Sequence, residues 1–91
     1  MGRRSRLEIY YDVLLVICKG VQKPTRIMYK SNLSWGPLQE ILESLLAQGF
    51  IQERVSNKSK RYEITPKGIN VLEYYGRAKE VFTTKVVKLR R

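Results

Sequence analysis

Apolar residues recur at intervals of three or four along the first half of the chain, which is the period of an α-helix. The first such stretch predicts a helix over residues 6–19. Ser5 and Glu8 form the pattern of a capping box at its start, and Gly20 provides a natural stop. The apolar positions of this helix are Leu7, Tyr10, Val13, Leu14, Ile17 and Cys18. Because Cys18 lies on the apolar side of the pattern, we expect a buried structural thiol there.

Two more helical stretches follow, separated by a short turn. Thr25 is placed to cap a short helix over residues 26–30, and residues 31–33 form the turn. Ser34 then caps a third helix that ends at Gly49, with apolar positions at Leu38, Ile41, Leu42, Leu45 and Leu46. Two helices joined by a tight turn, the second longer and more amphipathic, describe a helix-turn-helix.

After residue 50 the period of the pattern changes to two, which indicates β-strands. A polar run at residues 56–60 separates two alternating segments, so we predict a β-hairpin with a basic tip. The alternating positions are Ile51, Glu53 and Val55 before the run and Tyr62 and Ile64 after it. Thr65 supplies an N-cap hydroxyl and Pro66 suits the first helical position, so another helix begins directly after the hairpin.

A hairpin that follows a helix-turn-helix describes a winged helix. The predicted fold class is therefore α+β and mostly helical: a winged helix-turn-helix of three helices and a two-stranded wing, with a long C-terminal dimerisation helix. We divide the chain into a basic N-terminal arm at residues 1–5, the winged helix-turn-helix at residues 6–65 and the C-terminal helix at residues 66–91. The alternative is a small α+β domain whose helices are merely packed and whose charges are solvated.

The C-terminal segment carries a heptad pattern that Lys79 interrupts, and this pattern predicts a seam between two copies of the chain. The predicted dimerisation residues are Leu72, Tyr75, Phe82, Val86 and Leu89. Gly76 and the β-branched run at residues 81–87 are poor helix formers, so the last turns fray, bend or become ordered against a partner. The alternative is a single helix that folds back on its own winged-helix core.

The charge of the chain points to a polyanionic partner. Lys and Arg number 18 against 8 Asp and Glu, which gives a net charge of +10. Nucleic acid is the first expectation, because neutralising phosphates releases condensed counterions, and an anionic membrane or an acidic protein is the weaker one. The candidate DNA contacts are Arg26, Lys30, Ser34, Trp35 and Gln39 in the helix-turn-helix, Lys58, Lys60 and Arg61 in the wing, and Arg3, Arg4 and Arg6 near the N-terminus. For Trp35, packing at the helix junction is the equal alternative to a DNA contact.

Composition excludes several other kinds of site. The chain has one cysteine and no histidine, so it has no internal disulfide and no metal site built from His and Cys clusters. We find no paired catalytic carboxylates, no nucleophile with a base and no Gly-rich phosphate loop, and we expect neither an enzyme nor a cofactor. No apolar run approaches the length of a membrane span, so we expect no membrane partner and a cytoplasmic, nucleoid-associated protein.

Several segments resemble the archaeal winged-helix DNA-binding proteins of the Sulfolobus 10a chromatin type and related archaeal winged-helix transcriptional regulators. The resemblance covers roughly residues 5 to 80, and its most specific part is the sequence from Thr25 to Ser34. Further similar segments are Leu45 to Ile51 and Tyr62 to Gly68. The resemblance implies a dimeric DNA-binding fold whose long C-terminal helix pairs as an antiparallel coiled coil.

We therefore expect a homodimer that binds double-stranded DNA, either as a chromatin-associated protein or as a transcriptional regulator. The third helix exposes Glu40 and Glu43 and no Arg or Lys, so strong direct recognition of guanine is not indicated. Contacts to phosphates should dominate the affinity, with the wing contributing most of it. A winged-helix protein-interaction module or an RNA-binding adaptor is the alternative.

Overall fold

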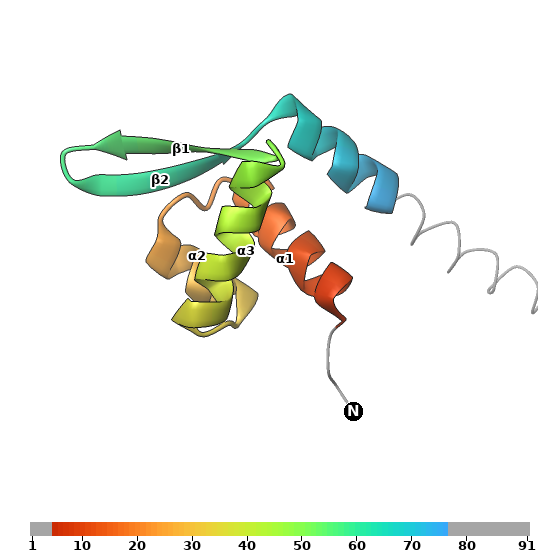
Figure 1. Ribbon diagram of the computed structural model, residues 1–91, viewed down its shortest axis with the longest axis horizontal. Helices are drawn as coiled ribbons and strands as arrows, with labels where there is room; N and C mark the ends of the chain where they lie inside the picture. The colour runs from red at the N-terminus through yellow and green to blue at the C-terminus, as the bar shows by residue number, and fades with distance from the viewer. Residues whose placement is uncertain (1–4, 77–91) are drawn as a thin grey trace, which may run out of the picture.

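The computed structural model describes residues 5–76 and confirms a winged helix-turn-helix (Figure 1). Its elements are α1 (Arg6–Cys18), α2 (Pro24–Ser31), α3 (Trp35–Ala47), β1 (Ile51–Ser56) and β2 (Ser59–Ile64). A further helix follows over residues 66–76. The remainder of the predicted dimerisation helix lies outside the described residues.

The start of α1 is as predicted, whereas the start of α2 is not. Ser5 and Glu8 form a reciprocal capping box, in which the Glu8 N–H donates to Ser5 Oγ at 3.1 Å and the Ser5 N–H to Glu8 Oε1 at 2.9 Å. In α2 the N-cap is Lys23, and Pro24 occupies the first turn. The prediction that Thr25 caps this helix is therefore wrong, because the fixed φ of proline already suits the first helical position.

The turn of the helix-turn-helix is shorter than predicted. Ser31 belongs to α2 and donates its hydroxyl to the Ile27 carbonyl at 2.5 Å. The chain then reverses at Asn32, which has a φ of 58° in the left-handed region that asparagine tolerates well. Ser34 is the N-cap of α3 as predicted, although its side chain makes no capping hydrogen bond.

One hydrophobic core joins the helices to the root of the wing. Its buried members are Val13, Leu14, Ile17, Ile27, Leu38, Ile41, Leu42, Leu45, Ile51, Tyr62 and Leu72. Cys18 is exposed and the prediction of a buried thiol is wrong. Each helical residue advances by about 100° around the axis, so Cys18 turns away from the core face that Ile17 occupies.

The two strands form an antiparallel hairpin with a tighter tip than the polar run suggested. Ile51 faces Ile64 at the root, and Ser56 faces Ser59 at the tip. Only Asn57 and Lys58 form the turn, with φ values of 46° and 67°. Positive φ at both central residues is the geometry of a type I′ turn, which matches the twist of the strands. The strands therefore extend into the run that the sequence assigned to the turn.

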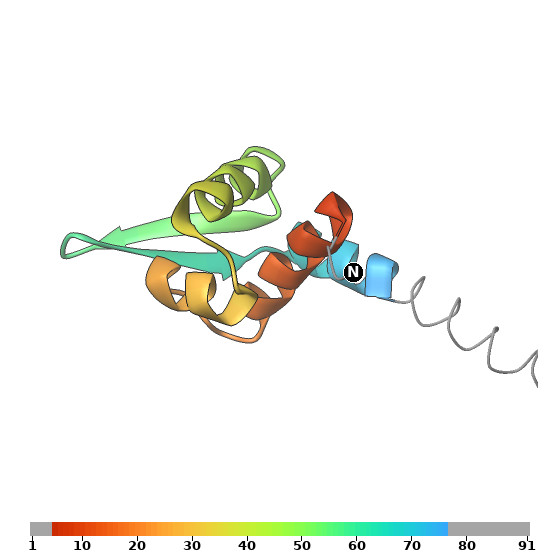
Figure 2. The same cartoon turned by 90° about the horizontal axis from the view of Figure 1, so that it is seen from below.

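The helices flank the hairpin on two sides. Figure 2 shows α3 on one side of the hairpin and α2 on the other, with α1 beside the root of the hairpin. The connector before α2 also contacts the hairpin, because the Tyr62 N–H donates to the Gln22 carbonyl at 3.0 Å. This contact places the beginning of α2 beside β2.

The helix over residues 66–76 is fixed to the root of the wing. Thr65 caps it as predicted, since its Oγ1 accepts the Gly68 N–H at 3.1 Å, and the same hydroxyl donates to the Gly49 carbonyl at 2.6 Å. The Thr65 N–H donates to the Phe50 carbonyl at 3.1 Å.

None of the helices within residues 5–76 has the length and apolar character needed to cross a bilayer.

Candidate nucleic-acid interface

The exposed face of α3 is acidic. Leu38, Ile41, Leu42 and Leu45 point into the core, which leaves Gln39, Glu40 and Glu43 in solvent. Trp35 begins the helix with 46 % of its surface exposed. It also lines a hollow beside Pro24, so Trp35 packs at the helix junction and still presents a free edge. The structure thus accommodates both interpretations of this residue.

A cleft of about 270 Å³ separates α3 from the inner face of the wing. Its lining residues are Pro24, Trp35, Gln39, Leu42, Glu43, Leu46, Glu53, Lys60 and Tyr62. Lys60 Nζ lies 3.3 Å from Glu53 Oε2, and the Tyr62 hydroxyl donates to the same oxygen at 3.4 Å. The ammonium group in the cleft is therefore already paired, and Glu43 adds a further negative charge. This cleft is a poor host for a phosphate.

The cleft also perturbs Tyr62. Burial raises the pKa of its hydroxyl above the usual 10.0, and the carboxylates of Glu53 and Glu43 raise it further. Since the unfolded chain then loses this proton at a lower pH than the folded chain, the phenol contributes stability below pH 10 that is lost as the pH rises above 10.

We expect Tyr62→Phe to flatten the decrease in stability above pH 10 relative to the wild type. Urea unfolding measured between pH 8 and pH 11 tests this, because the two proteins should differ in the slope of stability against pH. Parallel curves above pH 10 would show that the ionisation of Tyr62 is not coupled to folding.

The outer face of the wing has a different charge arrangement. Arg54 Nε lies 3.1 Å from Glu63 Oε1, while Arg61, which faces Arg54 across the strands, has no ion pair among the described residues. Successive residues of a strand point to opposite faces, so Lys60 and Arg61 lie on opposite sides of β2. Lys58 occupies the exposed tip. The predicted wing cluster is therefore three separate positions, and Lys60 is the one already engaged.

Arg61 lies instead beside the start of α2. Together with Lys23 and Arg26 it lines a hollow of about 300 Å³. Sequence reasoning missed Lys23, because the Lys23–Pro24 pair was interpreted only as a break between helices. The sequence feature that could have identified Lys23 is a lysine directly before a proline that can begin a helix. Lys30 is exposed further along α2.

The remaining predicted contacts are dispersed. Ser34 and Gln39 are exposed on the α3 side. Arg6 lines a different hollow with Leu33, Pro37 and Glu40, between α1 and the first turn of α3. Arg3 and Arg4 lie outside the described residues.

Comparison with known proteins identifies the family. A profile described as winged helix-turn-helix matches residues 3–83. The chain belongs to this winged helix-turn-helix family. This family is not one of enzymes, in agreement with the expectation from the motifs.

Archaeal relatives of this winged helix include an uncharacterized protein and a solved DNA-binding protein. MJ0287 of Methanocaldococcus jannaschii is 38 % identical over 66 residues, which are 72 % of this chain and 64 % of that protein. The crystal structure of Sso10a-2, a DNA-binding protein from Sulfolobus solfataricus, is similar with 28 % identity and a TM-score of 0.72, covering 97 % of this chain and 98 % of the other. The resemblance to the Sulfolobus 10a type is therefore confirmed.

A transcriptional regulator shares the same fold. The transcriptional regulator BldR from Sulfolobus solfataricus superposes with a TM-score of 0.77 at 15 % identity, over 89 % of this chain and 60 % of that one. At this identity the likeness concerns the fold alone. The chain spans 64 % of the length of MJ0287 and 35 % of the length of MJ0290, a second matching protein of the same organism.

The predicted dimerisation residues of this winged helix fall in two groups. Leu72 is only 7 % exposed and fills the core of its own domain. Tyr75 packs on Tyr11 of α1, with ring centroids 4.8 Å apart. Over residues 66–76 the helix thus covers its own core, as the fold-back alternative expects. Phe82, Val86 and Leu89 lie outside the described residues.

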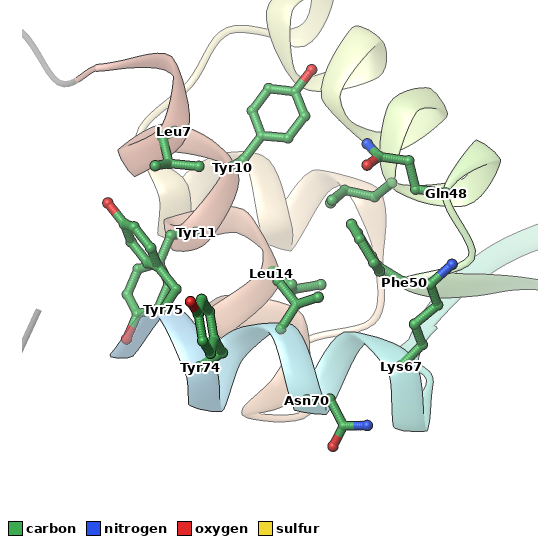
Figure 3. A pocket seen from close by; sticks show the side chains of 12 residues that line it. Leu7, Tyr10, Tyr11, Leu14, Gln48, Phe50, Lys67, Asn70, Tyr74 and Tyr75 are labelled. Carbon is green, nitrogen blue, oxygen red and sulfur yellow. The ribbon is translucent and has the colours of Figure 1, made fainter. Parts of the chain in front are cut away.

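An apolar groove of about 510 Å³ nevertheless remains open beside this helix (Figure 3). It is bounded by α1, the end of α3 and the helix over residues 66–76, and its lining includes Leu7, Tyr10, Val71 and Tyr74. Leu7 is 60 % exposed and Tyr74 is 79 % exposed. Lys67 is the one charged residue among the groove's described lining. An open groove with a mostly apolar lining therefore lies at this end of the described domain.

Proposed function

We propose that this protein binds double-stranded DNA through α2, α3 and the wing. The observation that carries the proposal is the position of the cations that have no ion pair among the described residues. Five of these cations lie on α2, in the connector before it and on the tip and outer face of the wing, at Lys23, Arg26, Lys30, Lys58 and Arg61. The other three, Arg6, Lys19 and Lys67, lie on α1, at its end and on the helix over residues 66–76. The likeness to Sso10a-2, a DNA-binding protein, supports the same conclusion.

In this arrangement α3 enters a major groove and the wing follows the adjacent backbone. The carboxylates of Glu40 and Glu43 on α3 oppose close approach to phosphates, so α3 contributes little electrostatic affinity. Phosphate contacts from α2 and the wing then supply most of the binding free energy, with modest preference for sequence.

The relative affinity for different duplexes distinguishes two roles. A chromatin-associated, nucleoid-bound role follows if random and operator-like duplexes bind alike. A regulatory role follows if one upstream duplex binds about a thousandfold more tightly.

A salt titration tests the phosphate-dominated mechanism. We expect the association constant for a random 20-base-pair duplex to fall by about a thousandfold between 50 and 200 mM NaCl, as for proteins with about six or more phosphate contacts. Fluorescence anisotropy of a labelled duplex measures it, and a single-stranded oligonucleotide and an RNA duplex of the same sequence are the controls. An affinity that hardly changes with salt would contradict the mechanism, and preference for the RNA duplex would favour the RNA-binding adaptor.

We further propose that the protein acts as a homodimer through its C-terminal helix. Leu72 and Tyr75 are occupied within their own domain, so the groove edged by Leu7, Val71 and Tyr74 is the surface that receives the second copy. Residues 77–91 continue from this helix and carry the remaining heptad positions. Pairing two domains places two winged helices on one duplex and raises their joint affinity.

A protein-interaction module is the second candidate function. The half-exposed Trp35 beside the carboxylates of α3 is the observation that favours it, because exposed aromatic side chains anchor protein interfaces. Trp35→Ala distinguishes the two functions when it is compared with Lys58→Glu. Loss of duplex affinity in Lys58→Glu with retention in Trp35→Ala supports DNA binding by the wing. Retained duplex affinity in Lys58→Glu, together with loss of a protein partner in Trp35→Ala, supports the protein interface.

A further inference from the structure

The hollow between the α1–α2 connector, the start of α2 and the outer face of β2 is lined by three cations. Gly20, Val21 and Gln22 form its uncharged wall, and Lys23, Arg26 and Arg61 are its other lining residues. No carboxylate is among them. None of the three cations has an ion pair within residues 5–76, and all three side chains are exposed.

Neighbouring cations of the same hairpin differ in this respect. Lys60 is paired with Glu53 and Arg54 with Glu63, at 3.3 Å and 3.1 Å. Arg61 directly follows Lys60 in sequence and faces Arg54 across the strands. The carboxylate of Glu63 on its own face is taken by Arg54 and by the amides of Gln52 and Gln22, at 3.1 Å and 3.5 Å. Three like charges that converge without a counter-charge repel one another, and an anion removes this repulsion.

The position of the hollow is set by the backbone. The Tyr62 N–H donates to the Gln22 carbonyl at 3.0 Å, which fixes the connector against β2 and places Lys23 next to Arg61. Arg26 follows within the first turn of α2. The backbone N–H groups of that turn have no side-chain cap and add favourable polarity, although the three side chains are the main contribution.

We propose that Lys23, Arg26 and Arg61 form a single binding site for a phosphate group, which is a phosphodiester of the duplex backbone when DNA is bound. Two guanidinium groups offer planar pairs of donors that match phosphate oxygens, and the ammonium group of Lys23 adds a point charge. The site joins the helix-turn-helix to the wing, so one phosphate fixes both elements on the DNA. This identification of the backbone as the source of the phosphate rests on the proposed function, whereas the site itself does not.

Two charge-matched double variants test the site. Lys23→Gln with Arg61→Gln removes two of its cations. Lys19→Gln with Lys60→Gln removes the same net charge from exposed neighbours that do not line the hollow. Circular dichroism first establishes that both variants fold. Each is then titrated with inorganic phosphate, followed by ¹H–¹⁵N NMR of the Gln22 amide and the arginine Nε–H groups, and with a labelled random duplex.

The expected result is that phosphate shifts the signals around Gln22 and Arg26 in the wild type and in the Lys19/Lys60 variant, and not in the Lys23/Arg61 variant. Duplex affinity should fall about tenfold further in the Lys23/Arg61 variant than in its control at equal salt. If phosphate shifts the NMR signals at the hollow but the two double variants bind the duplex equally well, the phosphate site stands. The DNA backbone is then not the source of its phosphate. Absence of phosphate shifts at the hollow in the wild type, with equal duplex affinities, would overturn the proposal. A wild type that shows the phosphate shifts and binds no duplex would refute the proposed function alone.

Discussion

Replacing Gly68 with alanine is expected to lower the free energy of unfolding by about 3 kcal/mol, the upper part of the usual range for overpacking. Gly68 lies in the first turn of the helix over residues 66–76 and is buried against the root of the wing. An added Cβ would stand 2.1 Å from the Phe50 carbonyl oxygen and 2.8 Å from Ile64 Cγ1. The nearest atom belongs to the backbone and accepts the Thr65 N–H, so it cannot move without breaking this hydrogen bond.

Gly36 provides the matched control. It lies in the first turn of α3, and an added Cβ meets nothing within 4 Å. Gly36→Ala should therefore leave stability unchanged or raise it by up to about 1 kcal/mol, since alanine has the higher helix propensity. Urea unfolding followed by circular dichroism measures both variants. Equal stabilities for the two alanine variants would show that the helix over residues 66–76 does not pack on the wing as described.

The fold was predictable from the sequence because its signals are local. The capping box at Ser5 and Glu8 and the Thr65–Pro66 start each need only neighbouring residues, and the structure confirms both helix starts. The errors arose where two local signals competed. At Lys23–Pro24–Thr25 the threonine hydroxyl suggested a cap, and the fixed φ of Pro24 prevailed. At Cys18, a helical period alone did not determine the edge of the buried face.

The candidate site was less predictable because it depends on which side chains meet. The sequence placed Lys58, Lys60 and Arg61 in one basic tip. Strand alternation and the carboxylate of Glu53 distribute them differently: Glu53 pairs with Lys60, and Arg61 turns toward the connector before α2. Pairing between residues far apart in sequence requires the register of the hairpin and the position of the connector. Lys23 became a candidate only through these two features.

Replacing Val71 and Tyr74 with glutamine is expected to convert a dimer into a monomer and to weaken duplex binding by about a hundredfold, the lower end of the avidity that linked sites provide. Both side chains edge the apolar groove and are exposed in the single domain, so the change should leave the fold intact. Neither substitution alters the net charge, so the phosphate contacts of the wing are unchanged. Sedimentation velocity reports the mass in solution, and anisotropy with a labelled duplex reports the affinity.

Ile69→Gln is the control for this pair, because Ile69 is 39 % exposed on the same helix and does not line the groove. It should remain a dimer with wild-type affinity, since burial of the groove's apolar surface, rather than general hydrophobicity of the helix, holds the copies together. A wild type that sediments as a monomer would refute the dimer. A Val71/Tyr74 variant that remains dimeric would move the interface from the groove to residues 77–91. In either case we expect the affinity of one domain for DNA to depend on the unpaired cations of α2 and the wing, because these lie on elements other than the helix over residues 66–76.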